Sequence, residues 1–249
     1  MAQPDRGRIE IFEDFVGVED PIALTAVPRA LGPFMVVGQG IADTDAGAPA
    51  LDSDGLSGAV QLTTTNEADH TTGLQTSSMF DVGLMGTIVV EARVRQAALS
   101  SREIFMGLTD INIGSDVPSI QANLSHIDTV TVTLTASDLV GFHLSSEATD
   151  ATDWHGIYNG GTTTGETTST SVDLNDVAVA GEWQVLRLEI ANNGTARWYT
   201  DGTLRQTVKG AVSTSTDLKF FIAAEAKATT IATLDVDYIY ISANRDWTV

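Results

Sequence analysis

Residues 183–204, WQVLRLEIANNGTARWYTDGTL, carry the pattern that decides the fold. Leu186, Leu188 and Ile190 alternate with polar residues, which is the period of two of a half-buried β-strand. Asn193-Gly194 and Asp201-Gly202 follow, and both dipeptides are typical of the two-residue turns that close β-hairpins. The stretch therefore predicts consecutive hairpins, with strands over Trp183–Ala191, Thr195–Thr200 and Leu204–Lys209.

The same alternation recurs along the rest of the chain, and no long amphipathic helix interrupts it. Gly38–Gly58 and Tyr158–Thr170 read as exposed loops. Many short strands without helices indicate an all-β sandwich or barrel, which we expect to form one domain over residues 9–249 after a short N-terminal arm, residues 1–8. Further strands are predicted over Ile9–Phe15, Met35–Ile41, Ala59–Thr64, Thr87–Arg95, Ile104–Leu108, Thr129–Thr135, Leu139–Leu144, Ser171–Leu174, Leu218–Ala224 and Leu234–Ile241.

The composition excludes several classes of function. The 249 residues include 13 basic and 33 acidic side chains, and the net charge of −20 disfavours binding to nucleic acid or to anionic membranes. With no cysteine, the chain has neither disulfides nor a thiolate nucleophile. Neither a signal peptide nor a membrane-spanning apolar run is apparent, so we expect synthesis in a cytoplasm.

Candidate catalytic residues are scarce. No Gly-x-Ser-x-Gly elbow occurs, and the four histidines share no metal-ligand spacing. His143 alternates with apolar neighbours on a predicted strand, which favours a sheet-face position over a catalytic one. Asp235-Val236-Asp237 lacks the third acid of a glycosidase strand, and we place it at a solvated strand edge. The sequence thus predicts a protein that is not an enzyme.

Two acidic loops supply the hard oxygen ligands that calcium prefers. They are Asp43-x-Asp45 and Asp52-x-Asp54-Gly55, and neither fits the EF-hand pattern. Acidic loops are expected in a chain of this charge, so we predict no obligatory cofactor and keep calcium as the one cation that these loops could hold.

One aromatic segment could bind sugar. Trp154 and Tyr158 flank polar residues where a strand would enter a loop, an arrangement that suits stacking on carbohydrate. The alternative, which we favour, is that Trp154 packs in the sandwich or against a partner subunit.

Several segments carry a family resemblance. Gly181–Leu204 resembles the strand and W/F-Y-x-D-G hairpin of concanavalin A-like (laminin G-like) jelly rolls, and Thr233–Tyr240 resembles their ending. Others resemble structural proteins of tailed bacteriophages, in the same order along the chain: Ile9–Gly17 (F-x-D-F-x-G), Gly73–Phe80 (G-x-Q-T…M-F), Val89–Arg95 (x-x-E-A-R-x-R) and Phe105–Asp110 (F-x-G-L-x-D).

The resemblance implies a jelly-roll β-sandwich of two antiparallel sheets without the catalytic acids of glucanases. It implies a non-enzymatic virion protein, foremost a decoration or cement protein on the capsid surface, bound to the major capsid protein or to copies of itself. Its contacts would include Arg6, Arg8, Ile9 and Ile11. The alternative is a lectin-like module of a head or tail fibre that binds host-surface glycan through Trp154 and Tyr158.

Overall fold

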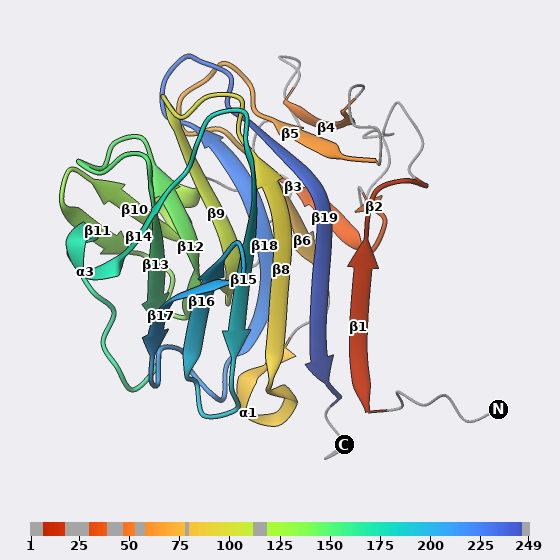
Figure 1. Ribbon diagram of the computed structural model, residues 1–249, viewed down its shortest axis with the longest axis vertical. Helices are drawn as coiled ribbons and strands as arrows, with labels where there is room; N and C mark the ends of the chain where they lie inside the picture. The colour runs from red at the N-terminus through yellow and green to blue at the C-terminus, as the bar shows by residue number, and fades with distance from the viewer. Residues whose placement is uncertain are drawn as a thin grey trace.

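The computed structural model describes residues 7–17, 30–38, 47–52, 58–77, 80–111 and 119–245 (Figure 1). Within them the three helices are single turns: α1 (Val82–Met85), α2 (Ile120–Asn123) and α3 (Ser169–Val172). Among these residues no helix is long and apolar enough to cross a membrane. Nearly everything else that is regular is strand, as the period-two alternation predicts.

The first sheet has eight antiparallel strands. Its backbone order places β8 and β19 at the centre, with β1 beside the second half of β19 (Figure 1). The order is β17 (Thr203–Val208), β16 (Ala196–Thr200), β15 (Trp183–Ile190), β8 (Ile88–Arg95), β19 (Thr233–Asn244), β5 (Val60–Thr63) and β4 (Ala48–Leu51), with β1 (Arg8–Glu13) off this path.

The second sheet has nine antiparallel strands, and a separate two-stranded hairpin lies beside it. The hairpin consists of β10 (Ser125–Asp128) and β11 (Thr131–Leu134). The sheet order is β14 (Asp173–Val177), β13 (Asp153–Asn159), β12 (Leu139–Ser145), β9 (Arg102–Thr109), β18 (Asp217–Ala226), β6 (Thr71–Thr76), β3 (Phe34–Val37) and β2 (Ala30–Leu31), with β7 (Phe80–Asp81) beside β18.

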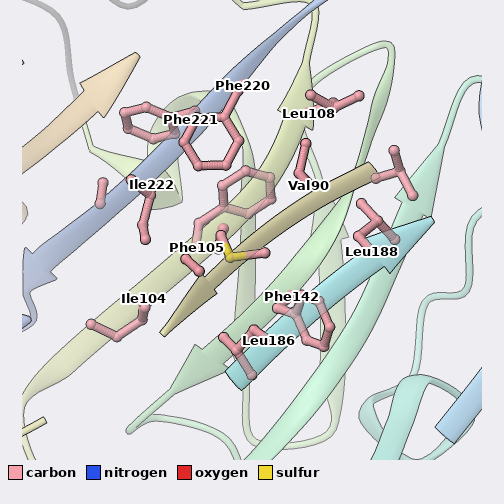
Figure 2. Close-up of a cluster of buried hydrophobic side chains, with 14 of the residues drawn as sticks. Val90, Ile104, Phe105, Leu108, Phe142, Leu186, Leu188, Phe220, Phe221 and Ile222 are labelled. Atoms are coloured by element: carbon pink, nitrogen blue, oxygen red, sulfur yellow. The ribbon is translucent and has the colours of Figure 1, made fainter. Parts of the chain in front are cut away.

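The core lies between the two sheets (Figure 2). Alternate residues of β8 and β15, such as Val90 and Leu188, face Phe142 and other apolar residues of the second sheet. Each fully buried side chain of this size stabilises the fold by about 1.5–3 kcal/mol through removal of apolar surface from water. Trp198 ties the layers together, because its indole Nε1 donates to the carbonyl of Gly141 at 2.9 Å.

The nine-stranded sheet also carries a cover on its outer face. Every residue of β9, β12 and β6 is buried, which a sheet with one solvated face would not allow. The cover is residues 119–136, comprising α2 and the β10–β11 hairpin, whose apolar side chains Ile120, Leu124 and Ile127 are fully buried. Polar side chains on this outer face are therefore enclosed between the sheet and the cover.

Two sequence predictions about local structure in the nine-stranded sheet are wrong. The segment that begins at Asp153 is not a loop mouth but the interior strand β13, buried on both faces. The strand expected from Ser171 begins as helix α3 and becomes extended only at Asp173.

Asp235 and Asp237 do not lie at a solvated edge either. They belong to the central strand β19, where they form ion pairs with Arg95 and Arg93 at 2.9 and 2.6 Å. The expected loop Gly38–Gly58 contains strand β4. The remaining strand predictions agree with observed strands to within a few residues.

Candidate functional site: a covered carboxylate–histidine cluster

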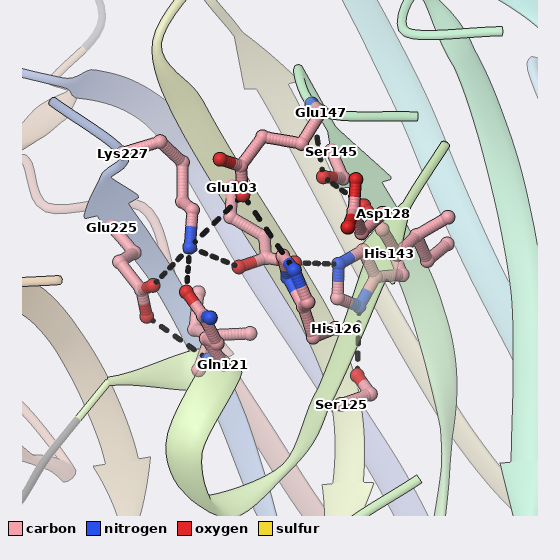
Figure 3. Close-up of polar contacts among 12 residues, drawn as sticks. Glu103, Gln121, Ser125, His126, Asp128, His143, Ser145, Glu147, Glu225 and Lys227 are labelled. Carbon is pink, nitrogen blue, oxygen red and sulfur yellow. Dashed lines mark hydrogen bonds and ion pairs between the residues drawn. The ribbon is translucent and has the colours of Figure 1, made fainter. Parts of the chain in front are cut away.

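Polar residues form a row across the outer face of the nine-stranded sheet (Figure 3). In the strand register Glu225 of β18 lies opposite both Thr71 of β6 and Glu103 of β9, and Glu103 lies opposite Ser145 of β12. Because side chains alternate between faces, these residues share the face opposite the core. His143, two residues before Ser145, lies on the same face.

Glu103 is the centre of the cluster. Its Oε1 lies 2.8 Å from His143 Nε2 and 3.1 Å from His126 Nδ1, and its Oε2 lies 3.6 Å from Lys227 Nζ. Burial by itself raises the pKa of Glu103, but the hydrogen bonds from His126 and His143 and the charge of Lys227 outweigh it and lower the pKa to about 2. Glu103 is thus a carboxylate at neutral pH.

His143 joins Glu103 to Ser125, whose Oγ lies 2.7 Å from His143 Nδ1. Burial lowers the pKa of His143, which keeps the ring neutral. Because a carboxylate only accepts hydrogen bonds, Nε2 carries the proton that His143 donates to Glu103, and Nδ1 accepts the hydrogen of the Ser125 hydroxyl. The order serine, histidine, carboxylate is that of a nucleophilic hydrolase.

Access to solvent distinguishes this arrangement from an active site. Ser125, His143 and Glu103 each have an exposed fraction of 0%. Ser125 belongs to β10 of the cover, so its hydroxyl points inward onto the sheet. An acyl group must come within bonding distance of a nucleophile, and this hydroxyl is not exposed to solvent in the part of the chain that the structure describes. The geometry supports a structural hydrogen-bond network between sheet and cover.

A second carboxylate completes the network. Glu225 Oε2 accepts from Gln121 N of the cover at 3.2 Å and from Thr71 Oγ1 at 3.1 Å, and Glu225 Oε1 lies 3.4 Å from Lys227 Nζ. Burial and the neighbouring charge of Glu103 raise the pKa of Glu225 to about 8, although Lys227 opposes the shift. At neutral pH the pair therefore holds one negative charge close to the ammonium group of Lys227.

An open hollow lies beside the cluster. Its volume is about 530 Å³, and Lys227 and Glu147 take part in its wall. Their side chains contact each other at 3.2 Å, which connects the hollow to the buried row. The remaining lining residues are Leu99, Ser100, Ser101, Ser146, Ala151 and Thr152.

The possible sugar platform of Trp154 and Tyr158 is contradicted by their burial. Trp154 is 0% and Tyr158 3% exposed, because both lie on the core face of β13. Trp154 packs edge-on against Phe142 and donates to Gln184 Oε1 at 3.0 Å, and Tyr158 packs against Trp198. Neither ring has a free face for a sugar, so the favoured interpretation of Trp154 as a core residue is confirmed.

The expected contact residues of the N-terminus fall in different places. Arg6 lies outside the described residues. Arg8 begins β1 and donates to Ser242 Oγ of β19, while Ile9 and Ile11 are half-buried against the core of their own chain. Of the expected calcium ligands, Asp43, Asp45 and Asp54 lie outside the described residues. Asp52 forms an ion pair with Arg95 at 2.8 Å.

The outer face of the eight-stranded sheet is a second candidate surface, which we call the arginine–aromatic face. Arg93 and Arg95 stack over the ring of Trp183, with their guanidinium carbons 4.8 and 4.6 Å from its centroid. Arg187 bridges Glu91 and Glu189 at 3.2 and 2.6 Å. The face comprises Phe12, Glu91, Arg93, Arg95, Trp183, Arg187, Glu189, Tyr199, Tyr238 and Tyr240, all half-buried except the exposed Phe12.

Sequence reasoning missed the centre of the cluster. Glu103 follows Arg102 at the start of a strand whose other members are mostly apolar, and a charge that leads into such a run is a usable sign of a buried, paired carboxylate. His143 was correctly placed on a sheet face. Its partners Ser125 and Glu103 are 18 and 40 residues away in sequence, so no local sequence pattern predicts that these side chains meet.

No protein-family model and no curated protein matches this chain. Solved structures do match. The carbohydrate recognition domain of Emp46p in its potassium-bound form has a TM-score of 0.56 at 11% identity and covers 92% of this chain and 94% of its own. The β-glucanase of Bacillus licheniformis has a TM-score of 0.54 at 13% identity and covers 93% and 97%. The fold is a concanavalin A-like jelly roll.

A conserved carbohydrate esterase from the Shiga toxin-encoding bacteriophage phi24B is also similar. Its TM-score is 0.50 at 14% identity, with 86% of this chain and 91% of that chain covered. At such identities the likeness shows the shared jelly roll and leaves the activity open, because this fold carries both lectins and hydrolases.

Proposed function

We propose that this protein is a non-enzymatic structural protein of a tailed-bacteriophage virion, foremost a decoration protein that attaches to the capsid surface. The observation that carries the proposal is the contrast between its two polar regions. The region with catalytic residue types is enclosed under residues 119–136, whereas the side chains of the arginine–aromatic face are half-buried, reach solvent and are ordered by their own ion pairs.

The composition of the arginine–aromatic face supports attachment. Arginine, tryptophan and tyrosine are enriched in protein interfaces and supply most of their binding free energy. The ion pairs of Arg93, Arg95 and Arg187 hold these side chains in place before a partner arrives, which reduces the entropy lost on binding.

Strand β1 extends this face. Phe12 is 62% exposed, and its ring lies 5.9 Å from that of Tyr238. Beside the aromatic rings of the face, this ring adds an apolar contact that a partner such as the major capsid protein or a second copy of the chain would cover. Symmetric, repeated attachment on a particle would convert modest contacts of this kind into firm binding.

Co-sedimentation with capsids that lack the protein tests the proposal. The wild-type chain should bind to saturation, and Phe12→Ser should weaken binding, because serine removes the exposed ring. Val130→Ser is the matched control, since Val130 is 48% exposed in the turn between β10 and β11, on the cover of the other sheet. Failure of the wild-type chain to bind, or equal loss with the control, would contradict the proposal.

A second candidate function is carbohydrate binding in the open hollow. Four hydroxyl side chains line it beside Glu147 and Lys227, and such groups bind the hydroxyls of sugars. The similarity to a carbohydrate recognition domain agrees with this candidate. Glycan binding that is lost with Glu147→Gln and retained with Phe12→Ser would favour it over capsid attachment.

A further inference from the structure

Three aspartates gather at the edge of the nine-stranded sheet, away from the arginine–aromatic face. Asp150 lies in the turn between β12 and β13, Asp153 is the first residue of β13, and Asp173 is the first residue of β14. One carboxylate oxygen from each lies within 4.8 Å of the other two. All three side chains are half-buried, so water can reach them while much of their surroundings is fixed.

The local structure explains why the carboxylates converge. Asp173 lies opposite His155 in the β13–β14 register, and Asp153 is two residues before His155, so all three share one face of the sheet. The register shifts between Asp153 and His155, and such bulges change the direction of nearby side chains. The turn places Asp150 close to Asp153, since the amide of Asp153 donates a hydrogen bond to the carbonyl of Asp150 at 2.9 Å.

The cluster lacks basic partners. Among the described residues no lysine or arginine forms an ion pair with any of the three aspartates. Negative charge is therefore concentrated here without a compensating side chain of fixed positive charge.

A buried histidine gives an independent indication. His155 is fully buried, and neither of its ring nitrogens makes a hydrogen bond within the described residues. Its Nε2 lies 3.2 Å from Oδ2 of Asp150, so the ring is directed at the cluster. The other oxygen of Asp150, Oδ1, is also buried without a hydrogen bond. Buried polar atoms nearly always have a partner, so Asp150 Oδ1 and the His155 ring, which has Asp150 as its one ionic contact among the described residues, mark a place where a further ligand belongs.

We propose that Asp150, Asp153 and Asp173 bind a hard divalent cation, with calcium as the first choice. Carboxylate oxygens are the ligands that calcium selects, and it tolerates the irregular geometry of a turn next to a bulge and fills its remaining positions with water. His155 acts behind Asp150 as a positioning residue. The ion would fasten the β12–β13 turn to the edge strand β14.

Calorimetric titration of the chelator-treated full-length chain with calcium chloride tests this site. We expect saturable binding of one ion per chain and a rise in melting temperature on binding. Asp173→Asn should weaken binding by roughly tenfold or more, because it removes one charged ligand at a half-buried position. The matched control is Asp217→Asn, since Asp217 is an exposed aspartate at the start of β18 and lies outside the cluster.

The stability of the ion-free variant separates a lost site from a damaged fold. Asp173→Asn relieves like-charge repulsion, so the ion-free variant should melt at or above the temperature of the ion-free wild type while losing the calcium-dependent rise. No saturable binding by the wild type at millimolar calcium would overturn the proposal. Equal calcium affinity in wild type and Asp173→Asn would also overturn it. The binding would then be explained by the net negative charge of the whole protein and not by a site that contains Asp173.

Discussion

The imidazole Nε2 of His143 lies 2.8 Å from Oε1 of Glu103, and both side chains are fully buried between the nine-stranded sheet and residues 119–136. This contact connects β12 to β9, and through Ser125 and His126 it connects both strands to the cover. The sequence of serine, histidine and carboxylate resembles part of a hydrolase active site. Because the three side chains are buried, we interpret the contact as one that stabilises the packing of residues 119–136 on the sheet. The stability of the cover should therefore depend on the charge of Glu103.

Glu103→Gln should destabilise the protein by about 3–5 kcal/mol, because it removes the buried negative charge that His126, His143 and Lys227 share at the centre of the network. Urea denaturation measures the effect. Glu147→Gln is the control, since Glu147 contacts the same lysine at 3.2 Å from a 41% exposed position and should cost much less. Equal costs for the two variants would show that Glu103 is not the centre of the network.

Glu225→Gln should change how stability depends on pH. The folded-state pKa of Glu225 is raised to about 8 from 4.5, so the unfolded chain loses this proton first and the wild type loses stability as pH rises through that interval. Glutamine keeps the hydrogen-bonding oxygen and cannot ionise. The variant should therefore gain stability relative to wild type between about pH 4.5 and 8. Melting temperatures across this range check the sign, and parallel curves would contradict it.

Ser125→Ala should cost about 1–3 kcal/mol, because it leaves His143 Nδ1 buried without a partner. It should leave any hydrolysis of ester substrates by the preparation unchanged, since the closed cover keeps this hydroxyl from substrate. Denaturation and an ester assay on the same samples provide the two readouts. An esterase activity that disappears with Ser125→Ala would mean that the cover opens and that the triad is catalytic.

Trp154→Ala should destabilise the fold by about 3–5 kcal/mol, the cost of a large cavity in a packed core. Gln184→Ala is the matched control, because it removes the hydrogen-bond partner of Trp154 Nε1 and leaves the ring in place. It should cost about 1–3 kcal/mol. A stable Trp154→Ala protein with altered glycan binding would contradict this account. It would indicate that Trp154 contacts sugar at the surface.

The sequence predicted the eight-stranded sheet better than the nine-stranded one, for a physical reason. β15 has one solvated face, so Leu186 and Leu188 alternate visibly with polar residues. β13 and β6 are buried on both faces, and their outer faces carry polar residues that are satisfied by the cover, such as Thr71 with Glu225. Alternation is lost in such strands. The site depends on contacts between distant segments, which no local pattern encodes.

Hydroxyl-radical footprinting of particle-bound protein tests the account most directly, because it reports which aromatic rings a partner covers. The account predicts that Phe12, Trp183 and Tyr238 of the arginine–aromatic face are oxidised in the free protein and protected on the capsid. The buried Trp154 and Trp198 serve as internal references that stay protected in both states. Capsid-bound protein with these three rings oxidised as readily as in solution would contradict attachment through this face.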